Sequence, residues 1–455
     1  MNIYLNKLLF LVLMLLVVLS PLPLGSNREW SWSLCALIAG LLVLAWALAN
    51  SGRNAPVYGR IPAWIPVLFL LTCAWVAVQT ASGTPLSWHH PVWALAGETL
   101  DLELPGRVTL SAEDSWVALM RLLSYALVFF LAFQFGRDRG CAQRVFGWLT
   151  LAGLAYAVFG LAIYWSGYAP DWLFGNRTLQ HNVHSTFINR NHFATWQGLT
   201  MLCAMAWYYH RMAKRVVKPY AVPQDREARA EEFILRAWKP LLVLLLMVTA
   251  LVLTHSRGGF VASLAGTLVL FVLLDRRVAS KSTRMRVTTI AVLAVAGLAF
   301  FLSSEALLER INRTDLTSEE RMAVYSNVER AIGDNPLLGF GYGTFADSFR
   351  LYDPLESGVH YDRAHNTWLE NAFELGVPAA LALYLALGGL AWFCFRGVRE
   401  RHRDWVYPAT GAAASVLVGV HAMVDFSLQL PAVAILYACI MGVACAQSCS
   451  SLEHR

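Results

Sequence analysis

Charged residues are scarce in this sequence. Only 15% of its 455 residues are charged, whereas 57% are hydrophobic, and the mean hydropathy is +0.48. A soluble domain is about a quarter charged, so this composition excludes an ordinary soluble protein and indicates a surface that mostly faces lipid. The eight cysteines fall in apolar runs or beside their basic ends, so no disulfide framework is predicted outside the membrane.

Long apolar runs take the place of the missing charge. A helix needs about 20 residues to cross the hydrocarbon core, and only helices satisfy a lipid-exposed backbone in runs of this length. We therefore expect an all-α integral membrane protein with about 12 transmembrane helices, the first of which is kept rather than cleaved as a signal peptide. The expected spans are approximately 5–24, 30–49, 62–80, 115–135, 143–165, 192–210, 239–254, 258–275, 286–304, 366–394, 406–425 and 430–447.

Lysine and arginine concentrate in alternate loops of this twelve-span arrangement. The positive-inside rule places these loops, and both termini, in the cytoplasm. We expect spans 1–9 over residues 1–304, a large periplasmic loop over 305–365, and spans 10–12 with a short cytoplasmic tail over 366–455, all integrated in one membrane domain. Basic residues of the cytoplasmic loops include Arg53, Arg60, Arg137, Arg139, Arg144, Arg211, Lys214, Arg215, Arg276, Arg277, Arg396, Arg399, Arg401 and Arg403.

The loop over 305–365 is the least hydrophobic stretch of the chain. Thr317 and Glu320 have the spacing of a capping box, and Arg321, Tyr325, Val328 and Ile332 then recur at helical spacing. This pattern predicts a surface helix that ends near Gly333. The glycines of the following Gly339-Phe340-Gly341-Tyr342-Gly343 segment permit a tight chain path rather than a dinucleotide site.

Three ionisable residues stand at the outer ends of apolar helices: Arg190, Arg257 and His365. An outer arginine can also snorkel to lipid phosphates, and a histidine at a helix start can cap its neighbours. As a set, however, they suit a diphosphate-activated substrate, because arginine binds phosphate through paired donors. A neutral histidine can accept the proton of an attacking sugar hydroxyl. No acidic pair at an outer helix end calls for a metal.

Other polar residues near these three are supporting candidates. Arg321 lies on the predicted loop helix and Arg121 about two turns into the fourth span. Glu370 and Glu374, one helical turn apart after His365, are predicted to be buried partners that orient polar groups rather than catalysts. Arg330 and Arg350 are further cations of the loop.

Four motifs in this order resemble the O-antigen ligase and O-antigen polymerase family of bacterial membrane enzymes. The resemblance covers roughly residues 185–380, and the earlier spans match only as hydrophobic helices. The motifs are Phe187-Ile188-Asn189-Arg190-Asn191-His192-Phe193-Ala194, Thr254-His255-Ser256-Arg257-Gly258-Gly259, Asp334 to Phe345 with the sequence DNPLLGFGYGTF, and His365-Asn366 followed by Gly376.

The resemblance implies a GT-C-like helical bundle in the bacterial inner membrane, with its active site on the periplasmic face. It implies an inverting glycosyltransferase that uses an undecaprenyl-diphosphate-linked glycan without metal or cofactor. His365 would be the general base or would orient the acceptor, Arg190 and Arg257 would hold the donor diphosphate, and Arg321 would be an auxiliary phosphate contact. The supporting candidates are Arg121, Asn189, His192, Asn366 and Glu370.

The acceptor, and with it the branch of the family, stays open. The ligase branch tends to have a threonine three residues past the glycine of the histidine motif, whereas here Gly376 is followed by Val377-Pro378-Ala379. Ligation to lipid A-core, polymerisation of an O-antigen or exopolysaccharide, and transfer to a protein all remain, with a chain-length regulator as a further partner and no nucleic acid. The alternatives are a twelve-span transporter or flippase for an envelope glycolipid, and a non-enzymatic scaffold.

Overall fold

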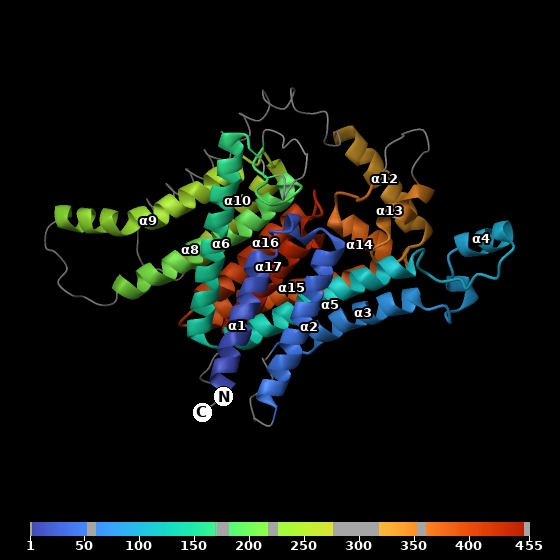
Figure 1. Cartoon of the computed structure of the whole chain (residues 1–455), viewed down its shortest axis with the longest axis horizontal. Coiled ribbons are helices and arrows are strands. Elements are labelled where there is room, and N and C mark those ends of the chain that lie inside the picture. Colours follow the sequence, from blue (N-terminus) through green and yellow to red (C-terminus); the bar gives the residue numbers. More distant parts are fainter. Residues whose placement is uncertain are drawn as a thin grey trace.

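The computed structural model describes residues 2–51, 61–168, 170, 182–216, 226–275, 318–352 and 361–449. These residues form helices and contain no strand (Figure 1). The helices are α1 (Asn2–Leu19), α2 (Glu29–Asn50), α3 (Trp64–Thr80), α4 (Val92–Leu100), α5 (Ala112–Gly136), α6 (Arg139–Ser166), α8 (Arg190–Val216), α9 (Arg226–Val252), α10 (Arg257–Asp275), α12 (Ser318–Asp334), α13 (Phe345–Ser348), α14 (Thr367–Leu375), α15 (Val377–Glu400), α16 (Val406–His421) and α17 (Pro431–Ser448).

Within the described part of the chain, 6 helices are long and apolar enough to cross a membrane: α2, α5, α6, α10, α15 and α17. Four shorter apolar helices accompany them, in α1, α3, α9 and α16. The expected all-helical membrane protein is therefore confirmed, whereas the number of twelve spans stays a prediction. The ninth expected span, 286–304, and Thr317 of the expected capping box lie outside the described residues.

Helix α17 forms the centre of the bundle. All of its residues are buried, and α5, α8, α15 and α16 pack around it. The approach to α5 is close because Gly442 has no side chain: a Cβ there would lie 2.5 Å from the carbonyl oxygen of Phe129. Small residues allow such contacts between membrane helices, where van der Waals packing replaces the hydrophobic effect.

The loops that the charge pattern assigned to opposite sides gather at opposite ends of the bundle. At one end, Arg139 of α6 forms an ion pair with Asp404 of the α15–α16 loop at 2.8 Å, and His210 of α8 lies 3.7 Å from the same carboxylate. At the other end, Asn191 at the start of α8 and Thr367 at the start of α14 both donate hydrogen bonds to Asp425.

Two elements differ from the expectation. The span expected over 366–394 is divided into α14 and α15 at Gly376, whose φ of 77° and ψ of 155° suit glycine alone. The apolar helix that could cross the membrane therefore begins at Val377. The loop expected over 81–114 contains the short helix α4, which has no buried residue and lies away from the bundle (Figure 1).

Candidate active site

His365 lies on the turn that leads into α14. Its φ of 53° is in the left-handed region, which a non-glycine residue adopts only where its surroundings hold it. The hydroxyl of Tyr325, on α12, donates a hydrogen bond of 3.0 Å to the carbonyl oxygen of His365. Asn366 caps α14, since its side chain accepts hydrogen bonds from the backbone N–H groups of Trp368 and Leu369. The surface helix and the α14 cap thus fix the same residue.

An ion pair between Arg363 and Glu370 forms a brace that holds this turn in place. Glu370 is fully buried and accepts one hydrogen bond from Arg363 Nη1 and one from the backbone N–H of Ala364, both at 2.9 Å. Burial alone would lower the pKa of Arg363, but the carboxylates of Glu370 and Glu374 raise it above its ordinary value. Glu370 therefore ties the two residues before His365 to the first turns of α14.

Glu374 holds the glycine-rich segment against the same helix. Its carboxylate accepts a hydrogen bond of 3.0 Å from the backbone N–H of Phe345, and its carbonyl oxygen accepts one of 2.9 Å from Gly341. Burial, and then the nearby Glu370, raise the pKa of this carboxyl. Gly341 has a φ of 108°, and a Cβ there would lie 2.1 Å from Thr109 Oγ1, so only glycine fits. The third and fourth motifs form one folded unit.

Arg190 begins α8 and lies beside the second motif. Asn189 precedes it and accepts a hydrogen bond of 2.8 Å from the backbone N–H of Asn191, which caps the helix. Burial, together with the positive charge of Arg190, lowers the pKa of His255. His255 in turn forms a hydrogen bond of 2.8 Å with Asn182. The first and second motifs are therefore neighbours.

Arg257 is the first residue of α10, and its side chain is exposed. The hydroxyl of Ser256 accepts a hydrogen bond from the N–H of Gly259 at 3.2 Å, which starts the helix. A Cβ on Gly259 would lie 2.5 Å from Ala194 of α8, so the glycine allows the two helices to touch. The packing brings the helix starts that carry Arg190 and Arg257 together at one end of the bundle.

Asp425 connects the first motif to the histidine motif and is not among the site residues predicted from the sequence. Its side chain is 1% exposed. It accepts a hydrogen bond of 3.3 Å from Asn191 and a second from the Ser427 hydroxyl, and it lies 3.9 Å from His192 Nε2. Although burial favours the neutral acid, His421, His192, Ser427 and His365 together hold the pKa of Asp425 below its usual range.

The ring of Phe426 lies between the imidazoles of His192 and His365. Its ring contacts His192 edge to face at a centroid distance of 4.7 Å and His365 at 5.1 Å. The guanidinium of Arg363 lies 6.0 Å from the centre of the same ring. The anion at Asp425 favours a positive charge on the His192 imidazole, but burial of that side chain is the larger effect and favours the neutral form.

The two remaining predicted arginines lie on different helices. Arg321 is on α12, one turn before Tyr325, and its Nε is buried without a hydrogen-bond partner among the described residues. Arg121 is on α5, and its guanidinium lies 4.8 Å from the centre of the Trp32 ring. Arg121 therefore contacts α2.

A cavity of about 910 Å³ extends from the histidine motif into the bundle. Most of its wall is apolar and comes from α3, α5 and α15. Polar groups line it where it meets α14 and the glycine-rich segment: Arg121, Tyr342, Arg363, Asn371 and Glu374. Arg121 and Arg363 thus line the same cavity. The described residues contain no group of three or more histidine, cysteine or carboxylate side chains suited to a metal ion.

One sequence signal could have identified Asp425. It is the only carboxylate between residues 405 and 449, and it follows an apolar span at the end where Arg190 and His365 lie. An ionisable residue in an apolar setting is a candidate functional residue, whether it is an acid or a base.

Comparison with known proteins agrees with the motifs. Residues 242–385 match the family model described as O-Antigen ligase. The search among curated proteins found no match. The matched range contains the second, third and fourth motifs, with Arg257, Arg321 and His365. The resemblance to the O-antigen ligase and polymerase family that the motifs predicted is confirmed over this domain.

Proposed function

We propose that this chain is a bacterial inner-membrane glycosyltransferase. It would move an undecaprenyl-diphosphate-linked glycan onto an acceptor hydroxyl at the periplasmic face, with the branch among ligase, polymerase and protein oligosaccharyltransferase set by the acceptor. One observation carries the proposal: within the family-matched domain, His365 is held in a strained conformation beside Asp425 and His192. A strained, braced residue next to a buried carboxylate is typical of a reaction centre.

In this mechanism, His365 accepts the proton of the acceptor hydroxyl as its oxygen attacks the anomeric carbon. The bond between that carbon and the diphosphate oxygen breaks, and the electron pair leaves with the lipid diphosphate. Asp425, which interacts electrostatically with His365, stabilises the imidazolium that forms. The leaving group is already an anion of a strong acid, so it needs charge neutralisation more than protonation.

Arginine side chains, rather than a metal ion, would neutralise the negative charge of the diphosphate. Arg190 and Arg257 begin neighbouring helices at the same end of the bundle, and guanidinium groups bind phosphate through two parallel donors. Arg321 contributes a buried Nε that has no partner among the described residues. Asn189, Asn366 and Glu370 act indirectly, through the helix caps and the brace described above.

The large cavity suits the lipid part of such a donor. Its apolar wall would take polyprenyl chain, while Arg121 and Arg363 line it near α14. Ligand cavities of this kind are mostly apolar with a few polar groups that set orientation. The carrier lipid would then enter from the membrane, with its diphosphate toward His365.

The test uses a strain that lacks the chain and is complemented with variants. His365→Ala is expected to insert normally and to lose glycan transfer, because no other base replaces the imidazole. His402→Ala is the matched control, since His402 is exposed beyond the far end of α15. Wild-type transfer by His365→Ala, at equal protein levels, would overturn the mechanism.

The same deletion strain identifies the acceptor. Full-length polymer left on undecaprenyl diphosphate indicates a ligase, and single repeat units indicate a polymerase. Loss of glycan from proteins alone indicates an oligosaccharyltransferase. Unchanged glycans, with transport of an intact glycolipid by the purified chain in proteoliposomes, would contradict a transferase and favour a flippase.

A further inference from the structure

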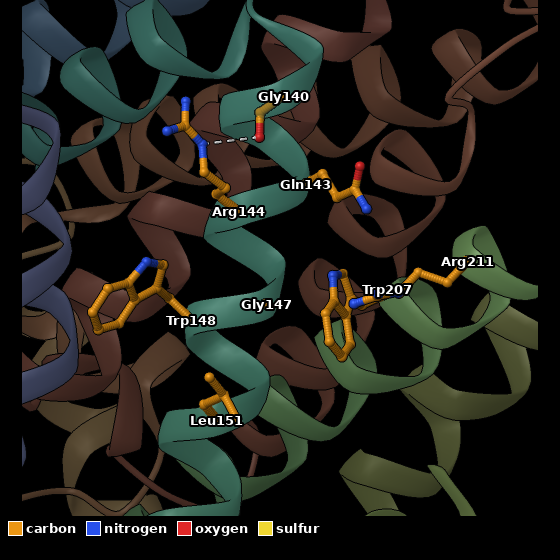
Figure 2. Close-up of a pocket in the computed structure, with 8 residues that line it drawn as sticks. All are labelled: Gly140, Gln143, Arg144, Gly147, Trp148, Leu151, Trp207 and Arg211. Atoms are coloured by element: carbon orange, nitrogen blue, oxygen red, sulfur yellow. Dashed lines mark hydrogen bonds between the residues drawn. The ribbon is translucent and has the colours of Figure 1, made fainter. Parts of the chain in front are cut away.

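A second hollow lies at the end of the bundle away from His365. It has a volume of about 330 Å³ and is formed by α6 and α8. Figure 2 shows α6 crossing the view, with Arg144 and Trp148 on one side and Gln143, Trp207 and Arg211 on the other. Arg211 is about 30 Å along α8 from Arg190, at a rise of about 1.5 Å per residue. The hollow is therefore separate from the candidate active site.

Two glycines of α6 form the floor of the hollow. Gly140 and Gly147 are about two turns apart, so they lie on the same face of the helix. A Cβ on Gly147 would meet the Trp207 ring at 3.4 Å, an ordinary contact, so the indole packs directly over the helix backbone. A Cβ on Gly140 would meet only Asp138 Oδ1, at 3.1 Å. The floor is consequently open at Gly140.

Two guanidinium groups line the hollow. Arg144 lies over the Phe10 ring at 5.1 Å and donates to the carbonyl oxygen of Gly140 at 3.3 Å, while Arg211 lies over the Trp207 ring at 4.7 Å. No acidic side chain in the described part of the chain forms an ion pair with either. The nearby acids have other partners: Asp138 caps α6, and Asp404 pairs with Arg139. The hollow is a cationic site whose charge is not balanced by these acids.

The remaining wall is apolar and faces outward. Trp148 and Leu151 are 37% and 61% exposed, on one of the helices that are apolar enough to cross a membrane. Tryptophan and arginine side by side at the end of such a helix are typical of the level of lipid head groups. A ligand that contacts both the arginines and the apolar wall must combine an anionic group, such as a phosphate, with acyl chains.

We propose that this hollow, formed by Gly140, Arg144, Trp148, Trp207 and Arg211, binds the head group of an anionic phospholipid. The phosphate lies over the open floor at Gly140, in the positive field of the two arginines that flank it, and the start of an acyl chain lies along Trp148 and Leu151. Such a lipid bridges α6 and α8. Because α8 also carries Arg190 and His192, the lipid stabilises the helix on which part of the candidate active site is built.

The test measures lipid binding to the purified chain in detergent. Phosphatidylglycerol is added, with phosphatidylcholine and inorganic phosphate as separate arms, and bound lipid is counted by native mass spectrometry beside thermal unfolding. Retention of phosphatidylglycerol and a raised melting temperature are expected in that arm alone. Equal effects of phosphatidylcholine would overturn the proposal, and equal effects of inorganic phosphate would show a free-phosphate site instead.

Variants assign the binding to this hollow. Each basic residue near an anionic lipid surface strengthens binding about fivefold, so Arg144→Gln with Arg211→Gln is expected to weaken phosphatidylglycerol binding about 30-fold. Gly140→Leu keeps both arginines and fills the floor, and it is expected to abolish the bound lipid. The control is Arg399→Gln, an exposed arginine that lies over Phe395 at 4.5 Å. Wild-type binding by Gly140→Leu would refute the site.

Discussion

Replacing Glu370 by glutamine tests whether the ion pair under the histidine turn positions His365. The carboxylate accepts hydrogen bonds from both Arg363 and the N–H of Ala364, each at 2.9 Å. A glutamine side chain has one acceptor oxygen, so one of the two donors faces an NH₂ group. The substitution changes no volume and leaves a cation without its anion.

The loss of folding stability in Glu370→Gln depends on how deeply Glu370 and Arg363 are buried. Removing one member of a buried ion pair costs about 3–5 kcal/mol, largely because the other charge is left uncompensated. The Glu370 side chain is fully buried, but the Arg363 side chain is 29% exposed, so water recovers part of the loss. We expect a destabilisation of about 3 kcal/mol, at the low end of that range.

The effect on transfer is expected in kcat. A misplacement of about 1 Å in a catalytic group can cost about 100-fold in rate, and Ala364 directly precedes His365. The proposed donor-binding residues, Arg190 and Arg257, are not part of this ion pair, so KM is expected to change little. The assay combines thermal unfolding in nanodiscs with steady-state transfer from a lipid-linked donor.

Two companion variants separate the causes. Glu374→Gln replaces a carboxyl whose pKa is raised by burial and by Glu370, so its neutral form is already favoured and little stability is lost. Adding Arg363→Gln to Glu370→Gln removes the unpaired cation, so stability recovers in part while kcat stays low. If Glu374→Gln destabilised as much as Glu370→Gln, or if Glu370→Gln kept both its melting temperature and its kcat, the positioning role would be refuted.

Three further predictions concern other parts of the site. Asp425→Asn removes the charge of a hydrogen-bond acceptor, and a hydrogen bond to a charged group is worth about 1.5–3 kcal/mol. If that energy is lost in the transition state, kcat is expected to fall roughly 10- to 150-fold in the same assay. The control is Asp347→Asn, which replaces an exposed acid and should have no effect. Gly376→Ala puts a Cβ 2.4 Å from the carbonyl oxygen of Leu337, at a φ of 77°. The free energy of unfolding, measured by thermal unfolding, is expected to fall by at least about 1–3 kcal/mol. Wild-type stability would contradict a strained junction at Gly376. Burial and Glu370 raise the pKa of Glu374 from 4.5 to about 8, so the folded state holds a proton that the unfolded state loses. Stability should therefore fall as pH rises through that window, and Glu374→Gln should flatten the melting-temperature profile; an unchanged slope would argue against the raised pKa.

Hydropathy predicted most of the helices because each apolar run belongs to one element. The ends of α2, α5 and α6 lie close to the expected spans 30–49, 115–135 and 143–165. The break at Gly376 does not lower the hydropathy of its run. It is held by contacts from a distant segment, such as the hydrogen bond of 2.8 Å from the Val377 N–H to the Pro336 carbonyl oxygen. A hydropathy window contains no information about such a partner.

The candidate site was predictable where its residues stand in local motifs. Arg190, Arg257 and His365 could be selected from helix ends alone, and the structure adds what surrounds them. Asp425 reaches the site only because α16 and α17 return the chain beside α8, a contact that spans more than half of the sequence. The link between Arg363 and Glu370 likewise depends on the turn at His365, whose left-handed φ no residue pattern specified.

The buried position of α17 has a consequence for how the protein is assembled. Ribosomes synthesise α17 after every other described helix, yet all of its residues are enclosed by helices made earlier. Those helices must therefore stay apart, or separate again, until α17 leaves the translocon. A chain stopped after residue 430 would leave Gly136 of α5, which packs on Val443, facing lipid. Truncated chains of this protein are accordingly expected to be recognised by membrane quality-control proteases rather than to form a smaller stable bundle.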